Sequence, residues 1–177
     1  MSEPTSPSGV APILLCLGSN IEPERNLRRA LAALAKVAEV RGISRVYCSP
    51  AVGNPSDPPF LNAAVELATP RAPRALKFDV LRPIEAALGR VRTAVKSAPR
   101  TIDLDLVIYG PMTFESEVMD IVLPSPELLR FAHVALPAAD LAPDFEHPAT
   151  GEPLAAIAAR LRAAEEIEEV AGFGWVG

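Results

Sequence analysis

A chain of 177 residues, 49% of them hydrophobic, has the size of one ordinary domain and enough apolar material to bury a core. Its formal net charge of -5 argues against a protein that nucleic acid or an anionic membrane attracts as a whole, so any phosphate binding must depend on local cations. No apolar run approaches the roughly 20 residues of a membrane span, and the first residues lack the pattern of a signal peptide, so we expect a cytoplasmic protein.

The N-terminal part of the chain is expected to begin with a lead-in, a strand and a helix. Residues 1–11 contain several prolines and serines and predict a disordered lead-in, which leaves residues 12–177 as a single domain. The apolar run 13–17 predicts a buried strand that ends in a turn at residues 18–20. Apolar residues at three- and four-residue spacing then predict a helix whose buried face extends to Leu34.

Two further strands and a long loop are expected next. Residues 40–48 and 60–67 have strand character, and residues 49–59, with four prolines and a glycine, must form the loop between them. A loop of this length in a small domain is often functional. Cys16 and Cys48 lie in the predicted strands, which favours buried thiols in a reducing compartment, with a disulfide bond as the alternative.

A second helix is predicted after Pro73, which suits a first helical turn, and Gly89 is placed to cap its end. Pro83 lies inside this pattern and should kink or shorten the helix. Residues 90–100 are polar and basic, and residues 102–109 predict a strand.

The C-terminal part is expected to contain a proline-rich segment after Gly110, a short helix near residues 134–141 and a last helix over residues 153–165. Strands and helices interleave without a glycine-rich nucleotide-binding loop and without an internal repeat. The order of elements therefore favours an α+β sandwich, in which helices pack on a mainly antiparallel sheet.

Asp103 and Asp105 are the most informative residues of the predicted strands. Residues two apart on a strand point to the same face, so the two carboxylates should lie together while Leu104 points to the other face. Such a pair is costly unless a cation compensates its charge, and hard oxygen ligands suit Mg²⁺ bound to substrate phosphates. Two solvated acids on an open sheet face are the alternative.

The segment before this strand supplies positive charge. It holds no acidic residue between Glu85 and Asp103. One guanidinium group can donate two parallel hydrogen bonds to the oxygens of a phosphate. The candidate phosphate ligands of this segment are Arg90, Arg92, Lys96 and Arg100. A solvated basic loop remains the alternative, but its position beside two metal-type carboxylates favours a phosphate clamp.

The run LGRVRTAVKSAPRTIDLDLVIYG, which contains these residues, resembles the signature of the hydroxymethyldihydropterin pyrophosphokinases. In that family a G-R-x-R element is followed by P-R-x-x-D-x-D and an apolar strand. The segments LGSN, SPAVGNPSDPPFLNAAVEL and LPSPELLRFAHVALPAADLAP follow the family's order at fitting separations. The resemblance extends from about Ile13 to Pro143.

The resemblance implies a ferredoxin-like sandwich in which ATP and two Mg²⁺ ions meet a reduced pterin under mobile loops. The pterin hydroxymethyl oxygen would attack the β-phosphorus of ATP and release AMP, as a step of folate biosynthesis. It implies small molecules as the partners, with no nucleic acid and no membrane, and a monomeric protein.

The residue roles that the resemblance implies fall into three groups. Metal binding falls to Asp103 and Asp105, which would also act in catalysis together with Arg90 and Arg92. ATP binding falls to Glu85, Arg90, Arg92, Lys96, Arg100, Ser125 and Arg130. Pterin binding falls to Ser49, Pro50, Val52, Phe60, Asn62 and His133, among which the Asn62 amide can both donate and accept hydrogen bonds.

The chain departs from the family pattern at several of these positions. Ser125 stands where the family has a histidine. Phe131 stands where the family has an arginine, although Arg130 is adjacent to it in this chain. His133 stands where an aromatic residue usually stacks on the pterin. Ser97 likewise replaces an aromatic residue. These differences leave open a paralogue that acts on another pterin, or one that binds nucleotide or pterin without catalysis. A ferredoxin-like RNA-binding module is disfavoured, because the chain is acidic and lacks basic, aromatic-rich strands.

Overall fold

A computed structural model describes residues 11–176. The lead-in predicted for residues 1–11 therefore lies outside the described residues, except for Ala11. Among residues 11–176, no helix is both long enough and apolar enough to cross a membrane.

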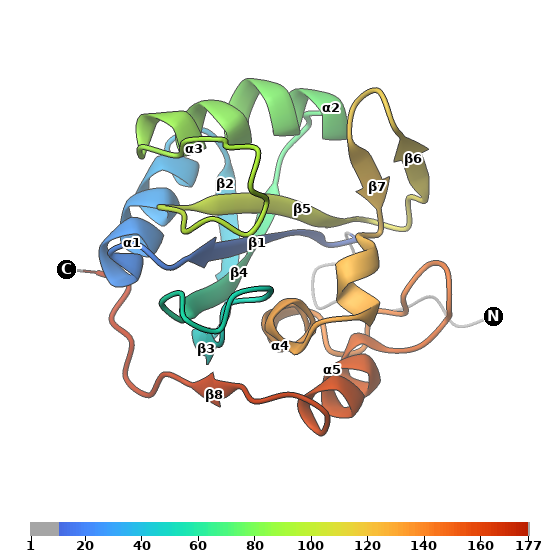
Figure 1. The fold of residues 1–177 in the computed structure, drawn as a ribbon. Helices are drawn as coiled ribbons and strands as arrows, with labels where there is room; N and C mark the ends of the chain where they lie inside the picture. Colours follow the sequence, from blue (N-terminus) through green and yellow to red (C-terminus); the bar gives the residue numbers. More distant parts are fainter. Residues whose placement is uncertain (1–10, 177) are drawn as a thin grey trace.

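The centre of the fold is an antiparallel sheet (Figure 1). Five of its strands follow one another in the order β5 (Asp103–Tyr109), β1 (Ile13–Ser19), β4 (Phe60–Ala68), β3 (Tyr47–Ser49) and β8 (Glu168–Glu169). The sixth, β2 (Glu39–Ile43), also pairs with β4. All of these pairings are antiparallel, as predicted.

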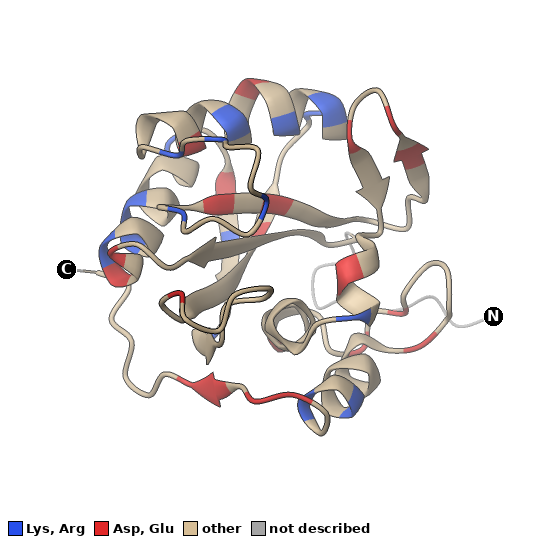
Figure 2. Ribbon diagram, in the orientation of Figure 1, with Lys and Arg blue, Asp and Glu red and all other residues tan. Residues whose placement is uncertain are grey.

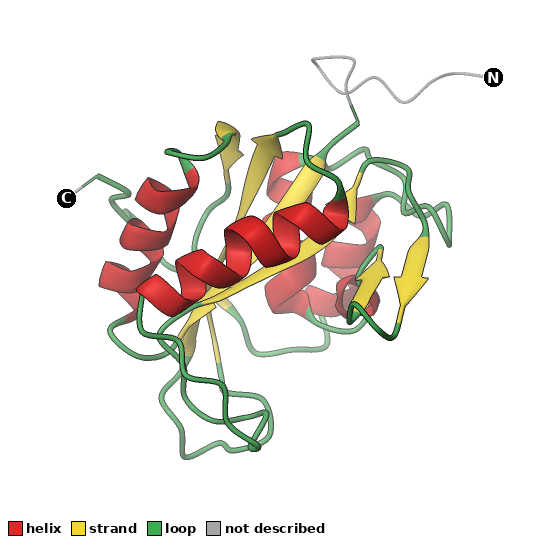
Figure 3. Ribbon diagram, turned by 90° about the horizontal axis from the view of Figure 1, so that it is seen from above, coloured by secondary structure: helices red, strands yellow, loops and turns green. Residues whose placement is uncertain are grey.

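Helices cover both faces of the sheet, because the side chains of each strand alternate between two cores (Figure 3). On β1, Leu15 and Leu17 belong to the core beneath α1 (Pro23–Leu34) and the helical segment that starts with α2. Leu14 belongs to the opposite core, beneath α4 (Ala132–Leu141) and α5 (Leu154–Arg162). The predicted sandwich is confirmed.

The strand predicted over residues 40–48 is in fact two strands. Between β2 and β3, the three residues 44–46 face only residues 63–64 of β4, so one residue is left over and the ladder breaks. At this break the Ser44 hydroxyl accepts a hydrogen bond from the Ala64 N–H at 2.7 Å, in place of a backbone carbonyl of the neighbouring strand.

The second helix runs through Pro83 without ending there. It consists of α2 (Pro73–Ala75), the π-helical segment η1 (Leu76–Leu81) and α3 (Arg82–Ala87). The π-helical turn just before Pro83 is wider than an α-helical turn, and it accommodates the proline, which has no backbone N–H to donate to the preceding turn. The predicted Gly89 cap is confirmed, with a φ of 85° and hydrogen bonds from Gly89 N–H to the Ala86 carbonyl and from Arg90 N–H to the Glu85 carbonyl.

The prediction was incomplete beyond Gly110. The proline-rich segment contains a hairpin of β6 (Phe114–Ser116) and β7 (Ile121–Leu123), followed by the 3-10 helix η2 (Pro126–Leu129). Strand β8 was also missed, and α5 ends three residues before the predicted position. These strands have two or three residues each, too few to show a period of their own.

Candidate active site

A cavity of about 410 Å³ opens where β1, β4 and β5 approach two long loops, residues 50–59 between β3 and β4 and residues 88–102 between α3 and β5. Ten of the predicted site residues line it: Ser49, Pro50, Val52, Phe60, Asn62, Lys96, Arg100, Asp103, Asp105 and His133. The other lining residues are Cys16, Leu17, Gly18, Gly53, Ser97, Glu127, Phe131 and Val134. Segments far apart in the sequence therefore meet around one space, which the resemblance had implied.

The register of the sheet sets the floor of the cavity. Gly18 of β1 lies opposite Asp103 of β5 on one side and opposite Asn62 of β4 on the other. A Cβ atom at Gly18 would lie 3.4 Å from Asn62 Oδ1 and 3.7 Å from Phe60 Cδ1. The glycine therefore keeps the floor open between the acidic strand and the amide.

The Asn62 side chain is buried and held in one orientation. Its Nδ2 donates to the Tyr47 carbonyl at 3.3 Å and to Ser49 Oγ at 2.9 Å. Both partners lie on β3, the neighbouring strand. Because the NH₂ group is used within the protein, Oδ1 is the atom that Asn62 can offer to a ligand as an acceptor.

Aromatic rings line the cavity from two sides. Phe60 lies at the start of β4, and Phe131 and His133 lie at the N-terminal end of α4. The rings of Phe131 and His133 stack with centroids 5.2 Å apart and planes inclined by 25°. Burial lowers the pKa of His133 to about 4, so at neutral pH its ring is uncharged and can stack on a flat apolar group.

Asp103 and Asp105 share the face of β5 that borders the cavity, while Ile102 and Leu104 are buried in the core on the other side. Asp103 Oδ1 accepts from Arg90 Nε at 3.0 Å, and Oδ2 is paired with Arg100. Figure 2 shows the two acidic positions on β5 beside the basic loop that follows α3.

Asp105 is accessible to solvent from the cavity, yet most of its surroundings are protein. Desolvation, with a further contribution from the Asp103 and Glu127 charges, raises the pKa of Asp105 to about 7. The cavity thus holds a carboxylate whose charge the protein does not compensate.

The pair of Asp103 and Asp105 fits a hard divalent cation, which would supply that compensation. Residues 11–176 contain no group of three or more Asp, Glu, His or Cys arranged as a metal site, so phosphate oxygens would have to complete the ligand shell.

Five predicted site residues do not line the cavity: Glu85, Arg90, Arg92, Ser125 and Arg130. Glu85 is buried in α3, and its two oxygens accept from the Leu104 N–H at 2.8 Å and from Arg92 Nη2 at 2.6 Å. Burial raises the pKa of Glu85 despite these contacts. Because Leu104 lies between the two aspartates, Glu85 fixes β5 rather than facing the cavity.

The other four occupy positions around the rim. Arg90 reaches the site through Asp103, and Arg92 is tied to Glu85. The Ser125 hydroxyl accepts a hydrogen bond from the Glu127 N–H and so caps the start of η2. Arg130 is exposed, and its guanidinium lies 5.2 Å from the centroid of the Phe131 ring.

Glu127 lines the cavity but was not predicted as a site residue, and no motif in the sequence pointed to it. It lies on η2, 22 residues beyond Asp105, and brings a third carboxylate to the cavity. Burial and the Asp103 charge raise its pKa. The sequence analysis named Phe131 only as the residue that stands in place of the family's arginine. Its position two residues before His133, a predicted pterin ligand, was the signal that could have placed it in the site.

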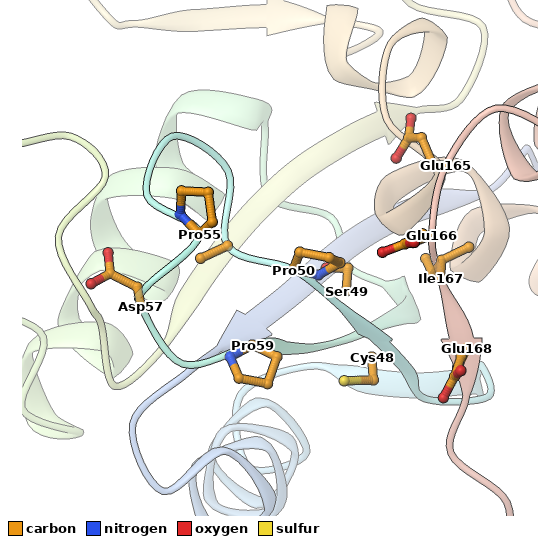
Figure 4. A pocket seen from close by; sticks show the side chains of 11 residues that line it. Cys48, Ser49, Pro50, Pro55, Asp57, Pro59, Glu165, Glu166, Ile167 and Glu168 are labelled. Carbon is orange, nitrogen blue, oxygen red and sulfur yellow. The ribbon is translucent and has the colours of Figure 1, made fainter.

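A second cavity, of about 600 Å³, lies on the other side of Ser49 and Pro50 (Figure 4). Its charged lining residues are all acidic: Asp57, Glu165, Glu166 and Glu168. A cavity with this lining would repel a triphosphate. The smaller cavity, which combines carboxylates with Lys96 and Arg100, is therefore the candidate active site.

Residues 14–143 match the model of the 7,8-dihydro-6-hydroxymethylpterin-pyrophosphokinase family, HPPK. The chain belongs to this family. The matched region contains every residue that lines the candidate active site. The HPPK enzymes are pyrophosphokinases, so the predicted class of enzyme is confirmed.

Among similar proteins, the 2-amino-4-hydroxy-6-hydroxymethyldihydropteridine pyrophosphokinase of Synechocystis is 40% identical over 139 residues, which are 77% of this chain and 69% of that protein. The enzyme of the same name from Pseudomonas aeruginosa is 35% identical, over 77% of this chain and 83% of its own length. That from Bacillus subtilis is also 35% identical, over 77% and 81%. These names give no support to a non-catalytic paralogue.

A solved structure of the Plasmodium falciparum HPPK-DHPS triple mutant with STZ-DHP has the same fold, with a TM-score of 0.66 and 12% identity. The alignment covers 86% of this chain and 43% of that one, so this chain corresponds to less than half of the HPPK-DHPS protein. The ferredoxin-like fold that the resemblance implied is thus confirmed.

Proposed function

We propose that this HPPK chain transfers pyrophosphate from ATP to the hydroxymethyl group of 6-hydroxymethyl-7,8-dihydropterin and releases AMP, as a step of folate biosynthesis. One observation carries the proposal: a single cavity joins a carboxylate pair and two cations to an aromatic wall with a buried amide. The first half suits a metal-bound triphosphate, and the second suits a flat heterocycle that carries hydrogen-bond donors.

The pterin ring would lie over Gly18, between Phe60 and the stacked pair of Phe131 and His133. Asn62 Oδ1 would accept a hydrogen bond from a ring N–H or amino group, since Nδ2 is already used by β3. The neutral state of His133 favours this arrangement, because an imidazolium ion in a buried aromatic wall would be costly.

The triphosphate would lie on the side of β5. Lys96 and Arg100 line the cavity there, and Arg90 reaches the same place through Asp103. Guanidinium groups that neutralise Asp103 in the ligand-free chain can bind phosphate oxygens instead. Arg92, which Glu85 holds on the adjoining loop, would act from the rim.

Asp103 and Asp105 would hold two Mg²⁺ ions together with ATP. When bound, the ions neutralise phosphate charge and make the β-phosphorus more electrophilic. The carboxylates would hold these ions and in this way orient the nucleotide, and the arginines would stabilise negative charge that develops towards the leaving AMP. The pterin oxygen would form the new bond to the β-phosphorus as the bond from that phosphorus to the AMP oxygen breaks. The bonding electrons would leave with AMP, and the hydroxyl proton would pass to solvent water.

The two long loops would exclude water from this reaction. Val52 on one loop and Val91 and Val95 on the other are exposed apolar side chains. Gly53 lies against Ser97, so the loops already approach each other without ligand. Burying these valines over bound substrates would leave the pterin hydroxyl as the only nucleophile at the phosphorus.

We propose that residues 12–177 act as one domain and that the enzyme is a monomer in the cytoplasm, with small molecules rather than nucleic acid or membrane as its partners. Cys16 and Cys48 are both free thiols, which suits a reducing compartment.

The test is to incubate the purified chain with Mg²⁺, ATP and 6-hydroxymethyl-7,8-dihydropterin and to measure AMP and pterin pyrophosphate. Equal amounts of the two products are expected. Omitting the pterin or chelating the metal should abolish AMP formation. Formation of ADP, or AMP formation that does not depend on the pterin, would contradict the proposal.

A further inference from the structure

A segment outside the region that matches the family, residues 165–170, contacts two walls of the candidate active site. The family match ends at residue 143. After α5, the chain passes along the outer edge of the sheet as β8 and then reaches α1 (Figure 1). We name residues 165–170 the C-terminal brace.

The first contact is at the start of α4. The residue before this helix is Phe131, whose side chain cannot accept a hydrogen bond, so it provides no cap. Glu165 Oε1 accepts the Ala132 N–H at 3.1 Å instead. Ala132 lies between Phe131 and His133, so this carboxylate fixes the helical turn that carries both rings.

The charge of Glu165 adds to this contact. The N-terminus of a helix carries unpaired N–H groups and a partial positive charge, and a carboxylate stabilises both. A residue 33 positions along the chain thus accepts one of the unpaired N–H groups of the first turn, although a capping serine or aspartate would accept from the second or third helical residue instead.

The second contact is at the edge of β3. Tyr47 and Cys48 pair with Glu169 and Glu168 of β8, and the Val170 N–H donates to the Val46 carbonyl at 2.8 Å. Without β8, β3 would be an edge strand only three residues long. Figure 4 shows the brace beside Ser49, whose hydroxyl accepts from Asn62.

We propose that the C-terminal brace is part of the pterin-binding site, and that Glu165 is a positioning residue that holds Phe131 and His133 against the pterin ring. This inference depends on the proposed function for the identity of the ligand. It adds to the site a segment that does not line the candidate cavity and that acts instead through the start of α4 and through β3.

The test compares Glu165→Ala, Glu165→Gln and Glu166→Ala in the full chain. Loss of a helix cap should weaken pterin binding by about threefold to thirtyfold in Glu165→Ala, measured by fluorescence titration with 6-hydroxymethylpterin and as the KM for the dihydropterin. The KM for ATP should stay within about twofold of wild type, because the metal side of the cavity lies on β5. Glu165→Gln keeps an acceptor oxygen and should restore most of the affinity.

Glu166→Ala is the matched control, because it removes the exposed neighbouring carboxylate. Wild-type pterin affinity in Glu165→Ala, or equal losses for pterin and ATP, would overturn the inference while leaving the proposed function intact. A wild-type chain that neither binds pterin nor forms AMP would overturn both. If Glu165→Ala does not fold, Glu165→Asp tests the same point, because it keeps the negative charge but shortens the side chain that reaches the Ala132 N–H. A folded Glu165→Asp variant with unchanged pterin KM contradicts the inference.

Discussion

At the scale of single residues, the candidate site combines groups that are unfavourable for the empty protein. Asp105 is a carboxylate with a raised pKa beside Asp103, and Asp103 itself is held by two arginines. His133 is kept neutral by burial. Such costs are expected where a ligand later supplies the missing charge or ring contact, because the protein surface alone gains nothing from them.

Asp105→Asn separates catalysis from stability. We expect transfer to fall by about 10³-fold or more, because a ligand of the proposed metal is lost. The ligand-free chain should become more stable by about 1 kcal/mol, a value discounted for the solvent that reaches this side chain. AMP-release assays and chemical denaturation measure the two effects. Asp144→Asn, which changes an exposed carboxylate, should alter neither. Asp105→Ala should abolish transfer as well, and near-normal turnover would contradict the proposed mechanism.

His133→Phe tests the buried imidazole through the pH dependence of stability. The pKa of His133 is lowered from 6.5 to about 4, so as the pH falls through this range the unfolded chain takes up a proton that the folded chain does not. The wild type should therefore lose about 2 kcal/mol more than the variant between pH 7 and pH 4.5. Denaturant titrations at the two pH values measure the difference. Parallel losses in both proteins would show that His133 is solvated in the folded state.

At the scale of elements, the helix that precedes the basic loop determines where the loop starts. The π-helical segment η1 carries the chain past Pro83, and the left-handed Gly89 then turns it towards β5. In the last turn, buried Glu85 holds both Leu104 of the acidic strand and Arg92 of the loop. The helix end, the loop and the strand thus share one set of hydrogen bonds.

Gly89→Ala should disturb this connection. Forcing a Cβ atom into a φ of 85° costs about 1 kcal/mol, and Arg90 and Arg92 directly follow. We expect a matching loss of stability and an increase of about threefold to tenfold in the KM for ATP. Gly151→Ala provides the control, because Gly151 has a φ of 71° with no atom within 4 Å of an added Cβ. It should lose the same stability but keep the KM. Equal KM values in the two variants would contradict a role for the helix end.

At the scale of the whole molecule, the sheet lies between two cores and contributes side chains to both. One lies between the sheet and α1 with the η1 segment, and the other lies between the sheet and α4 with α5. Strand β5 contributes Leu104 to the first core and Val107 and Ile108 to the second, and its two aspartates line the same cavity as the aromatic pair at the start of α4. The sheet joins them, so the nucleotide side and the pterin side are held on one rigid element.

Binding of Mg-ATP should therefore stabilise the whole fold. At a concentration about 100 times the Kd, linkage contributes about 2.7 kcal/mol, which corresponds to a rise in Tm of about 5 to 10 °C for a chain of this size. Thermal denaturation with ATP, with and without Mg²⁺, measures it. ATP in the presence of a chelator should give a much smaller rise, and Asp105→Asn should reduce the rise with Mg²⁺. An equal rise without metal would contradict the assignment of the aspartate pair.

The sequence by itself determined the elements that carry a local signal. The periodic face of α1, the Gly89 cap and the two-residue spacing of Asp103 and Asp105 all follow from a few neighbouring residues, because side-chain direction repeats along a helix or strand. The long motif around the two aspartates was chemically specific enough to indicate the family. Together with the other segments that resemble the family, it indicated ten of the residues that line the cavity.

Only the tertiary structure decided which distant residues complete the site. The register places Gly18 between Asp103 and Asn62, η2 brings Glu127 into the cavity, and Glu165 caps the start of α4. It also directed Glu85 away from the cavity and towards the backbone of Leu104. These contacts join residues 19 to 85 positions apart in the sequence, and no local periodicity encodes them. They depend on how the packed elements meet, which is a property of the folded chain as a whole.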